Sequence, residues 1–168
     1  MAKRVNMAAQ APLPSAQFLR EPELRRGMEL LYFGQAHLVR TADAELSARG
    51  LGRAHHRALY FVARRPDITV SELLSLLSIT KQSLGRVLNE LTERGLLEAR
   101  PGERDRRQRL LRLTDAGTAL ESELFESIRQ RMTAAYARAG QQAVGGYWAV
   151  LEGMIDDQAR AQIDSLSR

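Results

Sequence analysis

The sequence predicts a mainly α-helical fold of the α+β class, with a small β-hairpin in its second half. Three neighbouring signals between residues 69 and 113 lead to this class: a capped short helix, a second capped helix and a pair of strand-like runs. The first helix opens with a capping box, in which Thr69 and Glu72 each bond the other's backbone amide. The second has Thr80 as a good N-cap and ends at Gly95, with Arg94 placed to favour the negative helix end.

A β-hairpin is predicted directly after the second helix. Residues 96–100 (LLEAR) can form a strand, Pro101-Gly102 opens a turn, and residues 108–113 can pair back. Two helices joined by a tight turn and followed by a hairpin describe a winged helix-turn-helix, a module that binds duplex DNA. Much of the chain's net charge of +5 falls on this hairpin, where two acids, Glu103 and Asp105, lie among six arginines: Arg100, Arg104, Arg106, Arg107, Arg109 and Arg112.

The second helix has the two faces that a DNA-binding helix requires. Its apolar face is made by Leu84, Val87, Leu88 and Leu91. The residues predicted to contact DNA are Thr80, Lys81, Gln82, Ser83, Gly85, Arg86 and Asn89. Gln and Asn can pair bidentately with adenine and Arg with guanine, Lys and Ser suit phosphates, and the glycine leaves a bare patch for close approach. An ordinary amphipathic helix with a solvated polar face would look similar, so the basic hairpin beside it decides the interpretation.

A family resemblance becomes visible over these residues. The run ITVSELLSLLSITKQSLGRVLNELTERGLLEARPGERDRRQRLLRLTDAG, residues 68–117, resembles the DNA-binding lobe of MarR-family transcription regulators. Its most specific part is Asp105-Arg106-Arg107, followed by Leu113-Thr114-Asp115-Ala116-Gly117, and the segments TKQSLGRVLNEL and DRRQRLL are similar to a PetP-like branch. The resemblance implies that Asp105 orients an arginine, that Arg107 enters the minor groove, and that Arg104 and Arg106 lie near phosphates. Arg109 completes the predicted wing contacts.

The rest of the chain predicts helices on both sides of this lobe. Residues 1–20 are expected to form a flexible N-terminal arm. Helices are predicted from Glu23, over residues 53–64, from Thr114 to Gly140, and from about Gln142 through Ile155 as the last helix. The predicted domains are the DNA-binding lobe, residues 51–114, and a helical dimerisation region, residues 21–50 and 115–168.

The first predicted helix carries a long apolar stripe, formed by Leu24, Met28, Leu31, Leu38 and Ala42. That is more apolar surface than one small lobe would bury, so a partner is implied. Terminal helices that flank a central lobe suggest a homodimer, which the family resemblance also implies. Two copies would bind a near-palindromic operator, because each module contacts only a few base pairs.

The composition limits the classes of function. A pI near 10.2 favours a polyanionic partner, and double-stranded DNA is the simplest one. The absence of cysteine excludes thiol-based sensing, disulfides and thiolate metal sites. No run approaches the roughly 18 apolar residues that a membrane span needs, and no apolar segment follows Lys3 and Arg4, so no membrane partner is expected. A cytoplasmic location is predicted, associated with the nucleoid when the protein is bound to DNA.

The predicted function is therefore that of a sequence-specific transcription regulator, a ligand-responsive dimeric repressor. The alternative is a non-specific architectural nucleic-acid-binding protein, which would show salt-dependent binding without a preferred sequence. An enzyme is not predicted, since the sequence has no glycine-rich phosphate loop, no Gly-x-Ser-x-Gly elbow and no His-Glu-x-x-His helix.

No cofactor is expected, but the resemblance implies a small, often aromatic, anionic effector. Tyr32, His37 and His55 are candidate effector-binding residues because they are polar or amphipathic among apolar neighbours. Alternatively, all three are ordinary surface or core residues that bind no effector. A metal site is not predicted, because His55 and His56 diverge on a helix and a divalent ion needs several converging ligands.

Overall fold

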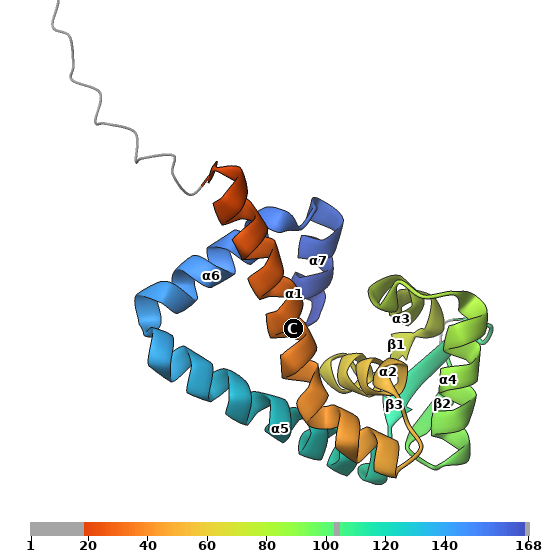
Figure 1. Cartoon of the computed structure of the whole chain (residues 1–168). Coiled ribbons are helices and arrows are strands. Elements are labelled where there is room, and N and C mark those ends of the chain that lie inside the picture. Colours follow the sequence, from red (N-terminus) through yellow and green to blue (C-terminus); the bar gives the residue numbers. More distant parts are fainter. Residues whose placement is uncertain (1–18, 103–104, 167–168) are drawn as a thin grey trace, which may run out of the picture. The chain divides into compact units, whose positions relative to one another are not determined.

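The computed structural model describes residues 19–102 and 105–166, and this part of the chain is mostly helical with one small sheet (Figure 1). The chain divides into two units, residues 1–37 and 38–168. The helices are α1 (Glu21–Ala48), α2 (Arg53–Arg64), α3 (Val70–Leu77), α4 (Lys81–Glu93), α5 (Asp115–Ala139), α6 (Gln141–Met154) and α7 (Asp157–Leu166). The strands are β1 (Ile68–Thr69), β2 (Leu97–Pro101) and β3 (Arg109–Leu113). Of the predicted N-terminal arm, residues 1–18 lie outside the described residues.

In the N-terminal unit, the described residues form the first part of α1. The helix begins two residues before its predicted start, because Pro22 fits a first helical turn and Glu21 and Glu23 favour its positive end. Glu21 pairs with Arg25 one turn later, at 2.6 Å. The large apolar side chains of this segment are exposed: Leu24, Met28, Leu30, Leu31, Tyr32 and Phe33. Leu24, Met28 and Leu31 of the predicted apolar stripe are among these exposed side chains.

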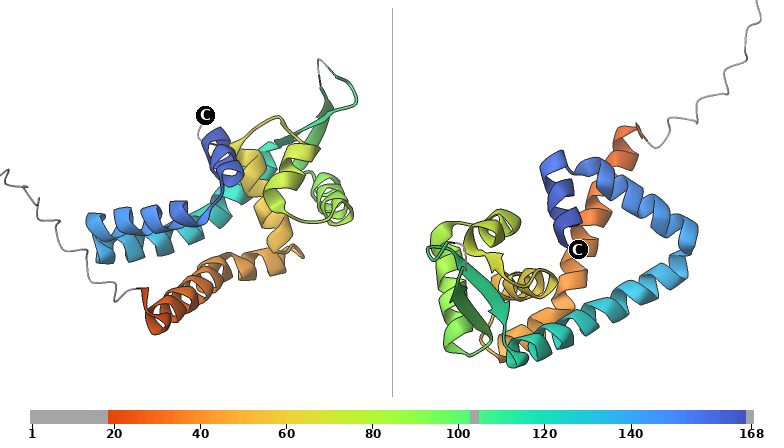
Figure 2. Two further views of the ribbon diagram at one scale, coloured as in Figure 1. Left: turned by 90° about the horizontal axis from the view of Figure 1, so that it is seen from above. Right: turned by 180° about the vertical axis from the view of Figure 1, so that it is seen from behind.

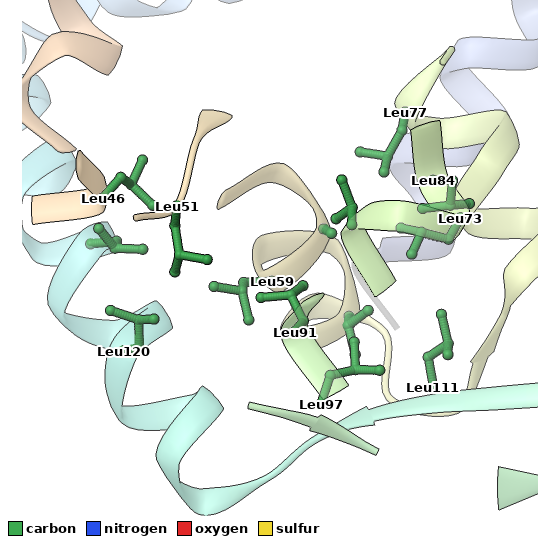
Figure 3. Packing of buried hydrophobic residues seen from close by; sticks show 14 of the residues in the cluster. Leu46, Leu51, Leu59, Leu73, Leu77, Leu84, Leu91, Leu97, Leu111 and Leu120 are labelled. Carbon is green, nitrogen blue, oxygen red and sulfur yellow. The ribbon is translucent and has the colours of Figure 1, made fainter. Parts of the chain in front are cut away.

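The second unit is built around a leucine-rich core that α2, α3, α4 and the sheet share (Figure 3). Each helix buries one face, as its apolar period requires. The largest fully buried side chains are Leu46, Leu59, Val62, Ile68, Leu73, Leu77, Leu84, Leu91, Leu97, Leu111 and Leu124. Burying one such leucine stabilises the fold by about 1.5–3 kcal/mol. The core therefore fixes which side of each helix faces solvent.

The sheet is antiparallel, with the strand order β1-β3-β2. The predicted hairpin is confirmed: Leu97 pairs with Leu113 and Pro101 with Arg109, so β2 and β3 each lie within one residue of their expected bounds. The sequence did not predict β1, a two-residue strand in which Ile68 pairs with Leu111. Figure 2 shows the hairpin of β2 and β3 extending beyond the helices of the lobe, as a wing does.

Thr114 and Gly117 connect the wing to α5. The Thr114 hydroxyl accepts from the Gly117 amide at 3.0 Å and donates to the Gly95 carbonyl at 2.6 Å. The Thr114 amide donates to the Leu96 carbonyl at 3.2 Å. A Cβ atom on Gly117 would lie 1.9 Å from that same carbonyl oxygen, so only glycine fits there. The Thr-Asp-Ala-Gly segment thus joins the ends of α4 and the wing to the start of α5.

The C-terminal part differs from the prediction of a single last helix. Helix α6 ends at Met154, and Ile155, predicted to continue it, is extended with φ −97° and ψ 149°. A separate helix, α7, follows, because the Asp156 carboxylate accepts from the Ala159 amide at 2.7 Å and acts as an N-cap. Within the second unit, the Gln162 amide of α7 donates to the Ser75 hydroxyl at 2.9 Å, and the Arg64 guanidinium donates to the Leu166 carbonyl at 2.9 Å. In the described ranges, no helix is long and apolar enough to cross a membrane.

Candidate nucleic-acid interface

Helix α4 presents its predicted DNA-binding face to solvent. Leu84, Val87 and Leu91 are buried in the core, and Leu88 is half-buried beside them. The N-cap and the polar positions are all exposed: Thr80, Lys81, Gln82, Ser83, Gly85, Arg86 and Asn89. Within the described residues, neither Lys81 nor Arg86 forms an ion pair. The predicted division into an apolar and a polar face is therefore present, and the charged groups of the polar face can meet a ligand.

The N-terminus of α4 has the features of an anion-binding end. The Thr80 hydroxyl accepts from the Ser83 amide at 3.2 Å and donates to the Ser83 hydroxyl at 2.8 Å. The first turn contains no acidic residue, and Lys81 adds a positive charge to the positive end of the helix dipole. A phosphate group would be favoured at this end.

A groove of about 310 Å³ lies between α4 and the sheet. Its lining residues are Val70, Gly85, Leu88, Asn89, Thr92, Glu93, Leu97, Ala99, Arg109 and Leu111. The groove brings Asn89 of the helix and Arg109 of the wing, both predicted DNA contacts, to one surface. A Cβ atom on Gly85 would meet nothing within 4 Å, so the fold itself does not require glycine there.

The wing turn is shaped by Gly102 and Asp105. The Gly102 amide donates to the Gln108 carbonyl at 2.9 Å, and a Cβ atom at this glycine would lie 2.7 Å from the Asp105 carbonyl oxygen. The Asp105 carboxylate accepts from the backbone amide of Arg107 at 2.9 Å. Asp105 thus positions the backbone of Arg107, while insertion of the Arg107 side chain into a minor groove stays a prediction. Arg104 lies outside the described residues.

Only some of the six wing arginines contribute free positive charge. Arg100 pairs with Glu98 on the same strand, and Arg112 pairs with Asp67 in the turn before β1. Arg106, Arg107 and Arg109 are exposed and form no ion pair within the described part of the wing. The charge of the wing was therefore overestimated from the sequence, because Glu98 and Asp67 neutralise two of its arginines.

His55, a predicted effector-binding residue, is engaged within the lobe. Its Nδ1 accepts from the Gly52 amide at 3.0 Å, so Nε2 carries the proton and donates to Glu90 at 2.8 Å. Its side chain is only 13% exposed. Tyr32 and His37 are exposed and belong to the other unit. An effector site at these three residues stays a prediction. Within the described ranges, no group of three or more acidic or histidine side chains could hold a metal ion.

His56 faces Asp43 of α1 and is half-buried. Burial lowers the pKa of His56 below its ordinary value of 6.5, and the nearby Asp43 carboxylate partly opposes that shift. A hydrogen bond from Arg53 holds the pKa of Asp43 below its usual range, so this carboxylate stays charged in mildly acidic solution. The folded protein therefore binds a proton at His56 less readily than the unfolded chain.

This difference predicts a loss of stability in acid. As the pH falls below about 6.5, the unfolded chain takes up a proton at His56 before the folded protein does, so the free energy of unfolding decreases. The variant His56→Gln is expected to lose less stability than the wild type between pH 7.5 and pH 5.5, measured as urea midpoints. An unchanged pH dependence in His56→Gln would contradict the expectation.

The comparisons with known proteins agree with this geometry. A family model described as MarR family matches residues 49–108, from the turn before α2 to the wing. The HTH-type transcriptional regulator PetP of Rhodobacter capsulatus is 47% identical over 149 residues, which cover 89% of this chain and 90% of PetP.

Solved structures share the fold at lower identity. A MarR variant from E. coli, complexed with operator DNA, matches with a TM-score of 0.62 at 22% identity and covers 80% of this chain and 96% of its own. Bordetella bronchiseptica BpsR, whose DNA binding is described as regulated by 6-hydroxynicotinic acid, matches with a TM-score of 0.62 at 20% identity and covers 78% and 99%. Since the PetP relative is similar over nearly the whole of both chains, the protein belongs to the MarR family of transcriptional regulators.

Proposed function

We propose that this regulator binds duplex DNA in a sequence-specific manner, as a homodimeric repressor on a near-palindromic operator from which a small molecule releases it. The observation that carries the proposal is the exposed polar face of α4, with Gly85 and Asn89 beside the wing residue Arg109 in one groove. A helix held by an apolar face, with base-pairing side chains opposite, is what major-groove recognition requires. The MarR variant bound to operator DNA has the same fold, which supports the assignment.

Each predicted contact has a distinct chemical role. Gln82 and Asn89 would pair with adenine and Arg86 with guanine in the major groove. Lys81 and Ser83 would contact phosphates at the N-terminus of α4. In the wing, Arg107 would enter the minor groove while the remaining cations, Arg104, Arg106 and Arg109, contact the backbone.

The homodimer is supported by apolar residues that the described chain leaves exposed. In α6 no residue is buried, and Tyr147, Trp148, Val150 and Met154 are all exposed. The first part of α1 has an exposed apolar surface of its own, from Leu24 to Phe33. A second copy would remove these surfaces from water, which stabilises an association in proportion to the apolar area buried.

The proposed effector is a small aromatic anion that binds the form of the dimer with lower DNA affinity. The ligand described for BpsR, 6-hydroxynicotinic acid, belongs to this chemical class and supports the choice. Tyr32 and His37 remain candidate contacts. His55 would have to give up a hydrogen bond to Gly52 or Glu90 in order to take part. We propose that the protein acts in the cytoplasm, where it meets chromosomal DNA.

Selection of bound duplexes from a random pool tests the DNA-binding proposal. Purified protein is expected to enrich a near-palindrome whose half-sites lie about one helical turn apart, roughly 34–36 Å. The architectural alternative predicts binding that weakens with salt but enriches no sequence. Light scattering on the free and the DNA-bound protein would give the number of copies. A monomer, or a pool without an enriched sequence, would overturn the proposal.

A substitution in the wing tests the minor-groove contact. Arg107→Ala is expected to weaken binding to the selected duplex more strongly when its flanks are A·T-rich than when they are G·C-rich. The reason is that a narrow A·T minor groove has the more negative potential. Fluorescence anisotropy with both flanked duplexes would measure the two affinities. Arg129→Ala removes the same charge from an exposed ion pair on α5 and should change neither. Equal losses on both flanks would assign Arg107 to phosphates instead.

A further inference from the structure

The short turn between α1 and α2, residues 49–52, is bonded to the C-terminal half of α4. The Arg94 guanidinium, at the C-cap of α4, donates to the backbone carbonyls of Arg49 and Gly50, the second at 3.3 Å. Gly50 has a φ of +63°, and a Cβ atom there would lie 3.4 Å from the Arg94 guanidinium. Arg94 therefore bonds this turn from the C-terminal end of α4, where the sequence analysis placed its charge.

A second connection links residues 49–52 to Glu90, which lies four residues before Arg94 in α4. Glu90 accepts from Nε2 of His55 at 2.8 Å, and Nδ1 of His55 accepts from the Gly52 amide at 3.0 Å. Glu90 and Arg94 are four residues apart and so lie on one side of α4. Both ends of the 49–52 turn are thereby connected to α4, through groups on one helix face.

The same turn is anchored to α5. The Arg49 guanidinium donates to both carboxylate oxygens of Glu123, each at 2.8 Å, and also to the Glu45 carbonyl at 3.0 Å. Between these contacts, Leu51 is buried in the core. One nitrogen of the Arg49 guanidinium, Nη2, bonds both carboxylate oxygens of Glu123, while Nη1 bonds the Glu45 carbonyl. The turn is therefore held by α5 on one side while it holds α4 on the other.

We propose that the 49–52 turn sets the angle at which α4 meets DNA, with His55, Glu90 and Arg94 as positioning residues. The inference rests on the proposed function, because it concerns specific recognition by α4. Apolar packing determines which face of α4 is buried and the approximate angle at which the helix crosses its neighbours. Hydrogen bonds with defined geometry at Glu90 and Arg94 add a directional constraint on its tilt. Base pairing depends on it, since bidentate contacts tolerate little displacement.

The test compares specific with non-specific affinity in the full chain. The probes are the duplex enriched from the random pool and a mixed-sequence duplex of equal length. Arg94→Ala and Glu90→Ala are each expected to lower affinity for the enriched duplex about tenfold or more, with less than about a twofold change on the mixed-sequence duplex. Glu90→Gln keeps an oxygen acceptor for His55 and should retain most of the preference. Arg129→Ala, which removes an exposed arginine from α5, is the matched control.

Amide hydrogen exchange on the free protein adds a readout that needs no DNA. Faster exchange confined to the C-terminal half of α4 is expected in Arg94→Ala, with α2 and α3 unchanged. If Arg94→Ala does not fold, Arg94→Lys replaces it, because lysine keeps the charge but lacks the planar guanidinium fork.

The outcomes distinguish a failure of the inference from a failure of the proposed function. A wild-type chain without a preferred sequence would overturn both. A wild-type preference that Arg94→Ala and Glu90→Ala retain would overturn the inference alone. Equal losses on the two duplexes would also overturn it, because they would make Arg94 a phosphate contact.

Discussion

Gly117→Ala is expected to destabilise the protein more than alanine at any other glycine of the described chain. The new Cβ atom would lie 1.9 Å from the Leu96 carbonyl oxygen and 2.9 Å from its carbon. These are backbone atoms, and the Leu96 carbonyl is held by the Thr114 amide, so neither side can move without breaking the connection to α5. Overpacking usually costs about 1–3 kcal/mol and occasionally more, and this clash belongs at the upper end. A loss of about 3 kcal/mol corresponds to a fall in Tm of roughly 6–12 °C.

Circular dichroism melting of the purified variant would measure this loss. Gly85→Ala is the matched control, because a Cβ atom on Gly85 meets nothing within 4 Å. Alanine in an exposed helix interior is favoured over glycine by about 0.5–1 kcal/mol, so the control should melt slightly above the wild type. Equal melting temperatures for Gly117→Ala and the wild type would contradict the close packing of α5 against Leu96.

Arg86→Ala is expected to have the largest effect on DNA recognition. A bidentate arginine–guanine contact contributes about 1–3 kcal/mol of discrimination against the wrong base. The proposed symmetric dimer would make the contact twice, so the loss on the enriched duplex would double to about 2–6 kcal/mol, at least about 30-fold in affinity. Arg86 is exposed and makes no ion pair within the described residues, so the Tm should stay close to that of the wild type.

Single-base variants of the enriched duplex locate the effect. Arg86→Ala should lose discrimination at one base pair in each half-site and keep it at the others. Arg129→Ala again serves as the control for removing one positive charge. If Arg86→Ala weakened binding to every duplex by the same factor, the side chain would contact phosphate, and base recognition would have to come from Gln82 or Asn89.

The parts of the fold that depend on near neighbours in sequence could be predicted. The caps at Thr69, Thr80 and Thr114 each bond the amide three residues later, so the local sequence contains the whole signal. β1 could not be predicted in this way, because Ile68 pairs with Leu111 and two residues have no period of their own. The break at Ile155 was missed because apolar spacing continues through it, although Asp156 is a good N-cap residue that could have indicated a new helix.

In the candidate site, too, the features that depend on nearby residues could be predicted and those that depend on distant residues could not. The exposed face of α4 follows from helical periodicity, so its residues were found together. The partners of the charged side chains could not be predicted, because they are distant in sequence. Arg112 pairs with Asp67, and His55 bonds Glu90, only in the folded lobe. His55, predicted from the sequence as an effector-binding residue, bonds Glu90 of α4 in the structure. The roles of the predicted DNA contacts and of the effector residues remain predictions.

At Gly85, the stability of α4 and its approach to DNA favour different residues. Alanine there would make the free protein more heat-resistant, because the helix gains and no neighbour is displaced. The added methyl group would project from the surface that we propose comes closest to the base pairs. Directed evolution for thermotolerance alone would thus be expected to fill this position and to yield a sturdier protein with poorer control of its genes.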